Sequence, residues 1–298
     1  MRVLVTGSTG LVGSALVPFL TTGGHTVSRL VRDGGGEHDL TWRPQRGEID
    51  EKGLAGFDAV IHLAGESIAE GRWTAEKKAR IRDSRVRGTA VLAAAVASRE
   101  NKPRVFVSSS AIGYYGDRGD EVLTEKSDAG DDYLANVCRA WEAETQPASD
   151  AGVRTVVARS GIVLAKHGGA LQRMLMPFKL GLGGKQGPGT QWMSWIALDD
   201  EIGALRAAID DDRLRGPVNL TAPNPMRNKD FADTLGRVLH RPTVLTTPLL
   251  PLKLRFGTEL VETLLLVSQR VEPARLNEVG FSFTYPDLES ALDALLRL

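Results

Sequence analysis

The chain has 298 residues, of which 42% are hydrophobic and 25% charged, a balance typical of globular rather than disordered proteins. Its 37 basic residues equal its 37 acidic residues, so we expect no nucleic acid or anionic membrane as a partner. The single cysteine, Cys138, excludes a disulfide framework, and no histidines have a metal-ligand spacing, so no metal is expected. No apolar run is long enough to span a membrane and no signal peptide is evident, which predicts a cytoplasmic protein.

The first 160 residues alternate short apolar runs with helical patterns. Strands are expected at residues 2–6, 26–31, 59–63, 104–107 and 153–158, and helices at 12–20, 74–98 and 133–149, the last capped by Asp131 or Asp132. Wholly apolar strands separated by helices are typical of a parallel sheet that is buried on both faces. The sequence therefore predicts an α/β fold with a doubly wound parallel sheet. The polar segment 33–56 is expected to be an irregular excursion between two strands.

The second half of the chain has a different sequence pattern. Five glycines in residues 181–189 predict a loop, which we expect to fold over a ligand as a lid. Further along, a helix from residues 199–200 to 209, a strand at 218–221, a helix at 228–239 and a leucine-rich tail are expected. We predict a first domain over residues 1–222, with a substrate loop inserted at 165–198, and a small, mostly helical C-terminal domain over 223–298. Trp192 and Trp195 either stack on a ligand or anchor that C-terminal domain.

Three glycines between the first strand and the first helix predict a dinucleotide site. Gly7 permits a tight turn, Gly10 lets the backbone approach a diphosphate, and Gly13 permits close packing of the helix on the strand. The N-terminus of the following helix offers unpaired N–H groups and a partial positive charge to phosphates. The same turn and helix start add three backbone positions to the expected site, namely Thr9, Leu11 and Val12.

The end of the second strand decides which coenzyme this site prefers. NAD sites usually place an acidic residue there, on the ribose hydroxyl, whereas the segment here contains Arg29 and Arg32. A guanidinium group makes paired hydrogen bonds to a phosphate, so we predict NADP with Arg32 on the 2′-phosphate. Arg29 is the second choice, and Asp33 keeps NAD open as the alternative.

Further motifs resemble the extended short-chain dehydrogenase/reductase superfamily. The Gly7-x-x-Gly10-x-x-Gly13 spacing, the segment His62-Leu63-Ala64-Gly65 and the serine motif that begins at Ser108 match its strand-end motifs. A narrower resemblance, to the atypical "epimerase family" proteins, covers nearly the whole chain. It rests on segments that include residues 64–68, Arg72-Trp73, 138–142, 159–164, 181–184 and 268–273.

The resemblance implies a Rossmann domain with its own short C-terminal domain, and binding of NADP(H). It also implies that the backbones of Leu63, Ala64 and Gly65 lie along the coenzyme, with Ser108 beside them. Arg85 stands where many members of the superfamily have asparagine, and we expect it to reach the ribose or the phosphates of the coenzyme.

In the superfamily, a Tyr-x-x-x-Lys pair and a serine carry out the proton chemistry. The resemblance makes Ser110 the candidate for the substrate-facing hydroxyl, with Ser109 as the alternate, and Tyr133 the candidate proton donor. The residue four positions after Tyr133 is Val137 rather than lysine, which departs from the pattern. A tyrosine near pKa 10 is a poor base without a neighbouring cation, so Arg85 is a possible replacement for the lysine charge.

Two functions remain open at this point. The first is an NADP(H)-dependent oxidoreductase or epimerase-like enzyme that acts on a small carbonyl or sugar-like substrate. The second is a catalytically inactive NADP(H)-binding redox sensor or interaction module, which the missing lysine favours. A homodimer formed through the helices at 74–98 and 133–149 is a further expectation. Cys138 and His62 are interpreted as buried structural residues rather than catalysts.

Overall fold

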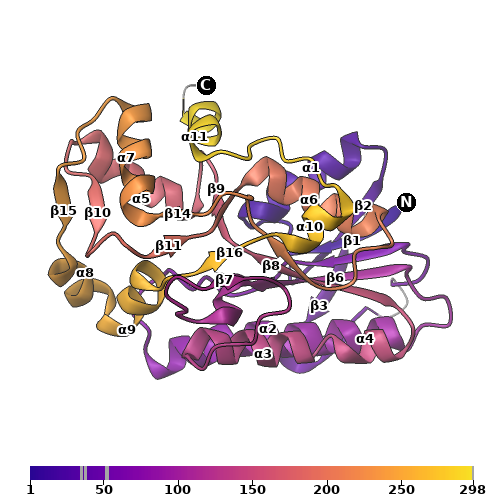
Figure 1. Cartoon of the computed structure of the whole chain (residues 1–298). Helices are drawn as coiled ribbons and strands as arrows, with labels where there is room; N and C mark the ends of the chain where they lie inside the picture. Colours follow the sequence, from indigo (N-terminus) through magenta and orange to yellow (C-terminus); the bar gives the residue numbers. More distant parts are fainter. Residues whose placement is uncertain (34–35, 37–38, 51–53, 297–298) are drawn as a thin grey trace.

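A computed structural model describes residues 1–33, 36, 39–50 and 54–296. Its main sheet has the strand order β13-β8-β6-β5-β1-β2-β3-β4 (Figure 1). The bounds of these strands are Arg2–Thr6 (β1), Thr26–Val31 (β2), Leu40–Arg43 (β3), Glu48–Ile49 (β4), Ala59–His62 (β5), Val105–Ala111 (β6), Arg154–Ser160 (β8) and Gly216–Leu220 (β13). Every neighbouring pair is parallel except β3–β4. The predicted doubly wound sheet is therefore confirmed.

The segment 33–56 is not the irregular excursion that the sequence predicted. Its described residues include β3, a 3₁₀ helix at Pro44–Arg46 and β4, and they extend the sheet beyond β2. The reason is Trp42, which is buried against the helix that follows β5 and gives this polar segment an apolar anchor. Parts of the segment, residues 34–35, 37–38 and 51–53, lie outside the described residues.

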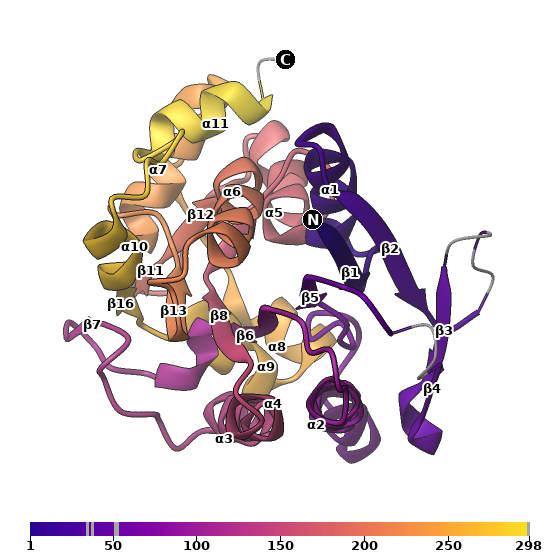
Figure 2. The ribbon, with the colours of Figure 1, turned by 90° about the vertical axis from the view of Figure 1, so that its right-hand side faces the viewer.

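Helices cover both faces of the sheet, as Figure 2 shows from its edge. One face carries α1 (Leu11–Thr22) and α6 (Leu198–Asp210), and the other carries α2 (Ala75–Ala97), α3 (Tyr133–Ala143) and α4 (Gln146–Asp150). Two apolar cores result, one on each face of the sheet. Strands buried on both sides explain why the sequence shows unbroken apolar runs rather than alternation.

Local capping sets the ends of the helices near the expected site. The Thr74 side chain accepts a hydrogen bond from Lys77 N at the start of α2, and Asp132 accepts one from Ala135 N at the start of α3. The single helix predicted over 133–149 is wrong, because the chain forms α3 and then α4. Pro147 lies at the start of α4, where its missing N–H and fixed φ angle begin a new helix rather than continue the old one.

The remaining elements build the second half of the molecule. They are β7 (Val122–Leu123), β9 (Ile162–Leu164), α5 (Gly169–Lys179), β10 (Gly184–Gln186), β11 (Trp192–Met193), β12 (Trp195–Ala197), β14 (Met226–Arg227), α7 (Asn228–Leu239), β15 (Leu245–Thr247), α8 (Leu249–Phe256), α9 (Thr258–Val261), a π-helical turn (Glu262–Leu266), β16 (Arg270–Val271), α10 (Ala274–Val279) and α11 (Leu288–Leu296). A 3₁₀ helix at Ile112–Tyr115 follows β6. None of the described helices is long and apolar enough to cross a membrane.

The glycine-rich segment 181–189 is not entirely a loop, contrary to the prediction. Its middle residues form β10, which pairs in parallel with β15. A Cβ atom on Gly184 would lie 1.7 Å from the Leu245 carbonyl oxygen, so glycine is what allows these two strands to meet. This short sheet fixes the segment against the C-terminal region instead of leaving it free.

Carboxylates fasten the C-terminal region onto the main sheet. The Glu125 side chain accepts hydrogen bonds from Asn219 N in β13 and Arg275 N in α10. Asp200, in the first turn of α6, accepts bonds from the backbone N–H groups of Thr284 and Tyr285. These contacts hold the C-terminal region near the carboxyl ends of the strands. Ligands of parallel α/β sheets bind at this edge.

Candidate functional site

The turn between β1 and α1 has the shape of a dinucleotide cradle. Gly7 has φ +68°, and a Cβ atom there would lie 2.6 Å from the Leu63 carbonyl carbon. A Cβ atom on Gly13 would lie 2.2 Å from the Gly7 carbonyl oxygen, so this helix can pack only with glycine. Gly10 differs, because its nearest neighbour would be the Gly7 oxygen at 3.3 Å and its other side is open. The opening faces the place where the sequence predicts a diphosphate.

Several polar groups at this turn are available to hydrogen-bond a ligand. The first N–H groups of a helix have no acceptor within it, and at α1 these belong to residues that include Leu11, Val12 and Gly13. Thr9 is exposed beside them. The Ser8 hydroxyl is buried and has no hydrogen-bond partner within the described part of the chain. The residues present therefore fit a bound diphosphate.

A buried pair joins β1 to β5 directly behind the cradle. Thr6 Oγ1 lies 2.7 Å from His62 Nδ1 and accepts hydrogen bonds from the backbone N–H groups of Leu63 and Ala64. Burial, with a contribution from the Arg85 charge, lowers the pKa of His62 to about 4. His62 is thus a neutral histidine that positions the strand end, as the sequence interpretation favoured.

The two arginines of β2 and its end have different surroundings. Arg29 donates to both oxygens of Asp39, with its Nε 2.9 Å from Oδ1, and so is already occupied. Arg32 is exposed and forms no ion pair with any residue whose position is described. This contrast favours Arg32, the first choice of the sequence, as the group free to meet a phosphate.

Ser110 belongs to a buried polar network at the end of β6. Its hydroxyl donates to Glu142 Oε1 at 2.6 Å, and Arg159 holds the same carboxylate through Nε at 2.9 Å and Nη2 at 2.8 Å. Ser110 and Arg159 are register partners on β6 and β8, and Glu142 reaches them from α3. With its proton committed to Glu142, the Ser110 oxygen is left to accept rather than donate a hydrogen bond.

The same network continues away from the cradle. Arg159 also donates to the Tyr115 hydroxyl at 3.1 Å, and that hydroxyl donates to Asn219 Oδ1 at 2.7 Å. Burial raises the pKa of Tyr115 to about 12. We call the set Ser110, Glu142, Arg159, Tyr115 and Asn219 the closed network, because its carboxylate and its guanidinium neutralise one another.

The other serines of β6 lie close by. Ser108 is buried and its hydroxyl contacts the Ser109 carbonyl oxygen at 3.3 Å, while Ser109 itself is partly exposed. Because side chains alternate along a strand, Ser109 points to the opposite face from Ser110. The buried thiol of Cys138 lies beside Ala111, and burial raises the pKa of this thiol to about 12, so it is an inert core group.

Tyr133 lies between α2 and α3 with its hydroxyl already engaged. That hydroxyl donates to the Lys78 carbonyl oxygen at 2.7 Å, and the ring packs edge-on against Trp73 at 5.2 Å between centroids. Burial raises the pKa of Tyr133 to about 12. Val137, where the superfamily has lysine, is buried in the core of α3. These contacts favour packing of Tyr133 over proton transfer.

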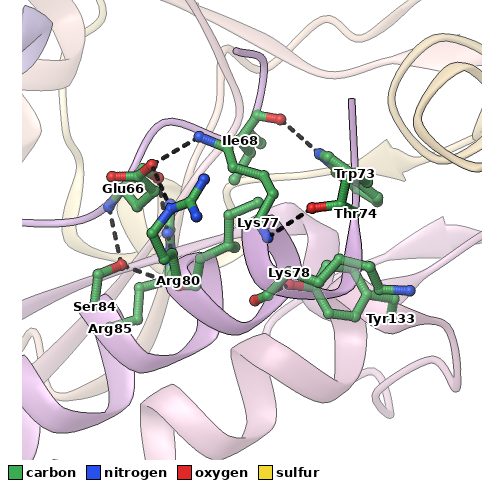
Figure 3. A network of polar contacts seen from close by, with 11 residues as sticks. Glu66, Ile68, Trp73, Thr74, Lys77, Lys78, Arg80, Ser84, Arg85 and Tyr133 are labelled. Atoms are coloured by element: carbon green, nitrogen blue, oxygen red, sulfur yellow. Dashed lines mark hydrogen bonds and ion pairs between the residues drawn. The ribbon is translucent and has the colours of Figure 1, made fainter. Parts of the chain in front are cut away.

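A second polar network, shown in Figure 3, holds the segment that follows β5 against α2. Lys77 Nζ lies 2.8 Å from Glu66 Oε1, and Arg80 approaches the same oxygen at 3.7 Å. Glu66 N donates to Ser84 Oγ at 3.0 Å. The hydrogen bond from Lys77 is the main reason that the pKa of Glu66 is lowered.

Arg85, which belongs to α2, completes this second network. Its Nη1 donates to the carbonyl oxygens of Glu66 at 2.9 Å and Ile81 at 3.1 Å, and its guanidinium group lies over the Trp141 ring at 5.1 Å. A Cβ atom on Gly65 would lie 3.3 Å from the Arg85 Cζ, so glycine leaves room for this cation. We call the set Glu66, Lys77, Arg80 and Arg85 the open network.

Two residues central to the site were not singled out from the sequence as functional. Glu142 and Arg159 appeared there only within motifs, because a buried ion pair between distant segments leaves no local pattern. Trp195, for which the sequence left ligand stacking and anchoring of the C-terminal region open, is fully buried in the core formed with α7 and α11, as the second alternative expects. Trp192 donates to Asp120 at 2.9 Å, and both Arg227 and Arg270 lie over its ring. Within the described residues, no group of three metal-ligating side chains occurs.

Known proteins resemble the chain over nearly its whole length. Residues 3–220 match the family model "NAD dependent epimerase/dehydratase family", and residues 247–295 match "Domain of unknown function (DUF1731)". An epimerase family protein of Mycobacterium bovis is 43% identical over 291 residues, which cover 97% of this chain and 96% of that protein.

Two solved structures are similar as well. The human epimerase family protein SDR39U1, crystallised with NADPH, is 35% identical with a TM-score of 0.92, over 100% of this chain and 99% of that one. A nucleoside-diphosphate sugar epimerase from Corynebacterium glutamicum is 40% identical with a TM-score of 0.83, over 99% of this chain but 58% of that one. From its glycine cradle to its C-terminal region, this chain belongs to the NAD-dependent epimerase/dehydratase family, among the epimerase family proteins.

Proposed function

We propose that this chain binds NADP(H) and acts as an NADP(H)-dependent oxidoreductase or epimerase-like enzyme on a small carbonyl or sugar-like compound. The observation that carries the proposal is the cradle at Gly7, Gly10 and Gly13, which is closed on two sides by backbone and open at Gly10. The human relative, which was crystallised with NADPH, supports the same coenzyme.

The residues that would hold the coenzyme follow from the site. The N–H groups at the start of α1, with Gly10 and Thr9, would bind the diphosphate, and Arg32 would bind the 2′-phosphate. The backbone of 63–65, the buried Ser108 and the partly exposed Ser109 would lie along its length. Bound NADP(H) would supply or accept a hydride at its nicotinamide ring.

Ser110 is the group proposed to face the substrate. Because its proton goes to Glu142, its oxygen is suited to accept a hydrogen bond from a substrate hydroxyl. Arg159 fixes Glu142 on the far side and so keeps the Ser110 hydroxyl in one orientation. Tyr133 stays the proposed proton donor from the superfamily pattern, although its hydroxyl would have to leave the Lys78 carbonyl to act.

A second function is favoured by a specific observation. Val137 is buried where a lysine would assist catalysis, and the Tyr133 hydroxyl is bonded to backbone. A chain that binds NADP(H) without turnover, as a redox sensor or interaction module, is consistent with both facts. A homodimer through α2 and α3 and a cytoplasmic location remain predictions for either function.

Calorimetric titration of the wild-type chain and of Arg32→Ala with NADPH and NADH tests the coenzyme assignment. The wild type should bind NADPH more tightly, and Arg32→Ala should lose about ten- to a hundredfold in NADPH affinity, because a charge-assisted bond is lost. The NADH affinity should change little, and Arg29→Ala serves as the matched control. Equal binding of both coenzymes by the wild type contradicts the Arg32 assignment.

A spectrophotometric screen separates the two functions. The purified chain is mixed with NADPH and a panel of quinones, sugars and aldehydes, and the absorbance of the reduced coenzyme is followed. Turnover that is abolished by Ser110→Ala supports the enzyme. Tight NADPH binding with no turnover across the panel supports the sensor.

A further inference from the structure

The Arg85 guanidinium group is a cation that is held by backbone carbonyl groups. It is mostly buried, and its Nη1 donates hydrogen bonds to two carbonyl oxygens, those of Glu66 and Ile81. No ion pair of Arg85 is formed with a carboxylate in the part of the chain that the structure describes. A buried guanidinium group that is hydrogen-bonded to dipoles rather than paired with a carboxylate keeps most of its electrostatic field.

Neighbouring charges do not cancel that field. The Glu66 carboxylate is already shared by Lys77 and Arg80, so the open network has three cations and one acid. The field extends to the end of β5, because the Arg85 charge contributes to the low pKa of His62. The closed network adds nothing to offset it, since Glu142 is paired with Arg159. The open network is therefore a positively charged region at the carboxyl end of the sheet.

The position of Arg85 relates this charge to one half of the coenzyme. Arg85 lies between the end of β5, at Gly65, and α3, at Trp141, on the side of β5 next to β6. Arg32 lies at the end of β2, two strands further along in the opposite direction. If the 2′-phosphate end of the coenzyme is at Arg32, the half that carries the nicotinamide lies toward Arg85.

The two redox states of the coenzyme differ in charge at that half alone. The oxidised nicotinamide ring carries one positive charge and the reduced ring carries none, while the phosphates are the same in both. We infer that Arg85 makes the site select the reduced coenzyme, NADPH, over NADP⁺. This inference rests on the proposed binding of NADP(H) and adds a preference for one redox state to it.

The expected preference is about tenfold. At an effective dielectric constant near 20, the interaction of two unit charges separated by about 10 Å changes a binding constant by roughly one order of magnitude. Tighter binding of the reduced form raises the potential of the bound couple by about 30 mV, since tenfold corresponds to that shift for two electrons. The protein would thus bind NADPH more tightly than NADP⁺ and would release the oxidised coenzyme more readily.

The test compares dissociation constants of NADPH and NADP⁺, measured by calorimetry, for the wild type and three variants. Arg85→Gln removes the charge, Arg85→Lys keeps it, and Arg87→Gln removes an exposed arginine of the same helix that pairs with Asp83. The wild type, Arg85→Lys and Arg87→Gln should prefer NADPH about tenfold. Arg85→Gln should bring the ratio of the two constants close to one, mainly by tighter NADP⁺ binding relative to NADPH.

Each other result overturns the inference in a recognisable way. A wild-type ratio near one does so without any variant, which covers the case in which Arg85→Gln does not fold. An equal loss of both affinities in Arg85→Gln, with the ratio retained, identifies Arg85 as a contact to the phosphates instead. Absence of binding to either coenzyme by the wild type refutes the proposed function itself.

Discussion

The closed and open networks both hold charged side chains at the carboxyl end of the sheet, yet they differ in balance. In the closed network, one carboxylate accepts two hydrogen bonds from one guanidinium group. The Ser110 hydroxyl donates to the same carboxylate, and the Tyr115 hydroxyl donates to the Asn219 amide oxygen. In the open network, one carboxylate is shared by Lys77 and Arg80, while Arg85 donates to the backbone carbonyl oxygens of Glu66 and Ile81. A balanced buried network stabilises a fold, whereas an unbalanced one is suited to a ligand.

The largest expected effect comes from breaking the closed network. Glu142→Gln leaves the buried Arg159 charge unpaired and should lower the free energy of unfolding by about 3 kcal/mol. Urea denaturation at pH 7 measures it. The matched control, Glu262→Gln, breaks the exposed pair with Lys253 and should cost less than about 1 kcal/mol. Similar small losses for both variants would show that the closed network is not a stabilising core.

The next effect concerns pH and links the open network to the strand behind it. Because the folded pKa of His62 is about 4 and its ordinary value is 6.5, only the unfolded chain takes up a proton between these values. The His62 contribution to stability is therefore present above pH 6.5 and is lost as the pH falls toward 4, by up to about 3 kcal/mol.

Comparison of the wild type with His62→Asn isolates this contribution. Denaturation at pH 7 and pH 4.5 should show a smaller loss on acidification in the variant. Glu201, whose pKa burial raises to about 7, acts in the opposite direction, but equally in both proteins. Arg85→Gln should shrink the loss more modestly, because its charge is the lesser cause of the His62 shift. Parallel curves for wild type and His62→Asn would contradict the assignment.

The smallest effect should follow the removal of the Tyr133 hydroxyl. Tyr133→Phe loses one hydrogen bond to a carbonyl oxygen and should cost about 1 kcal/mol in thermal or urea unfolding. The NADPH dissociation constant should stay within about twofold of the wild type, since the hydroxyl faces α2 rather than the cradle. If the screen detects a substrate, loss of its turnover in Tyr133→Phe would instead support proton transfer by this residue.

The sequence predicted the parts of the molecule that depend on local pattern. The doubly wound sheet, the turn at Gly7–Gly13 and the cap of α3 at Asp132 follow from periodicity and from residues close together in the chain. The break between α3 and α4 at Pro147 and the extension of the sheet by β3 were missed, although Pro147 and Trp42 are visible in the sequence. β10 was missed because it needs a partner strand about 60 residues away.

The site was predictable to a similar degree. The glycines and Arg32 occupy strand ends that a parallel topology brings together, so their placement could be anticipated from strand order alone. The bond from Ser110 to Glu142 and the occupation of Arg29 by Asp39 depend on packing between separate elements. The sequence ranked Arg32 before Arg29, and only the structure shows that Arg29 is held by Asp39.

A crystal structure of the chain with NADPH tests the account most directly. The account predicts the diphosphate over Gly10 at the start of α1, the 2′-phosphate within hydrogen-bond distance of Arg32, and the nicotinamide half on the Arg85 side of β5. A coenzyme that lies away from the Gly7–Gly13 turn, or that leaves Arg32 without a phosphate contact, would contradict it.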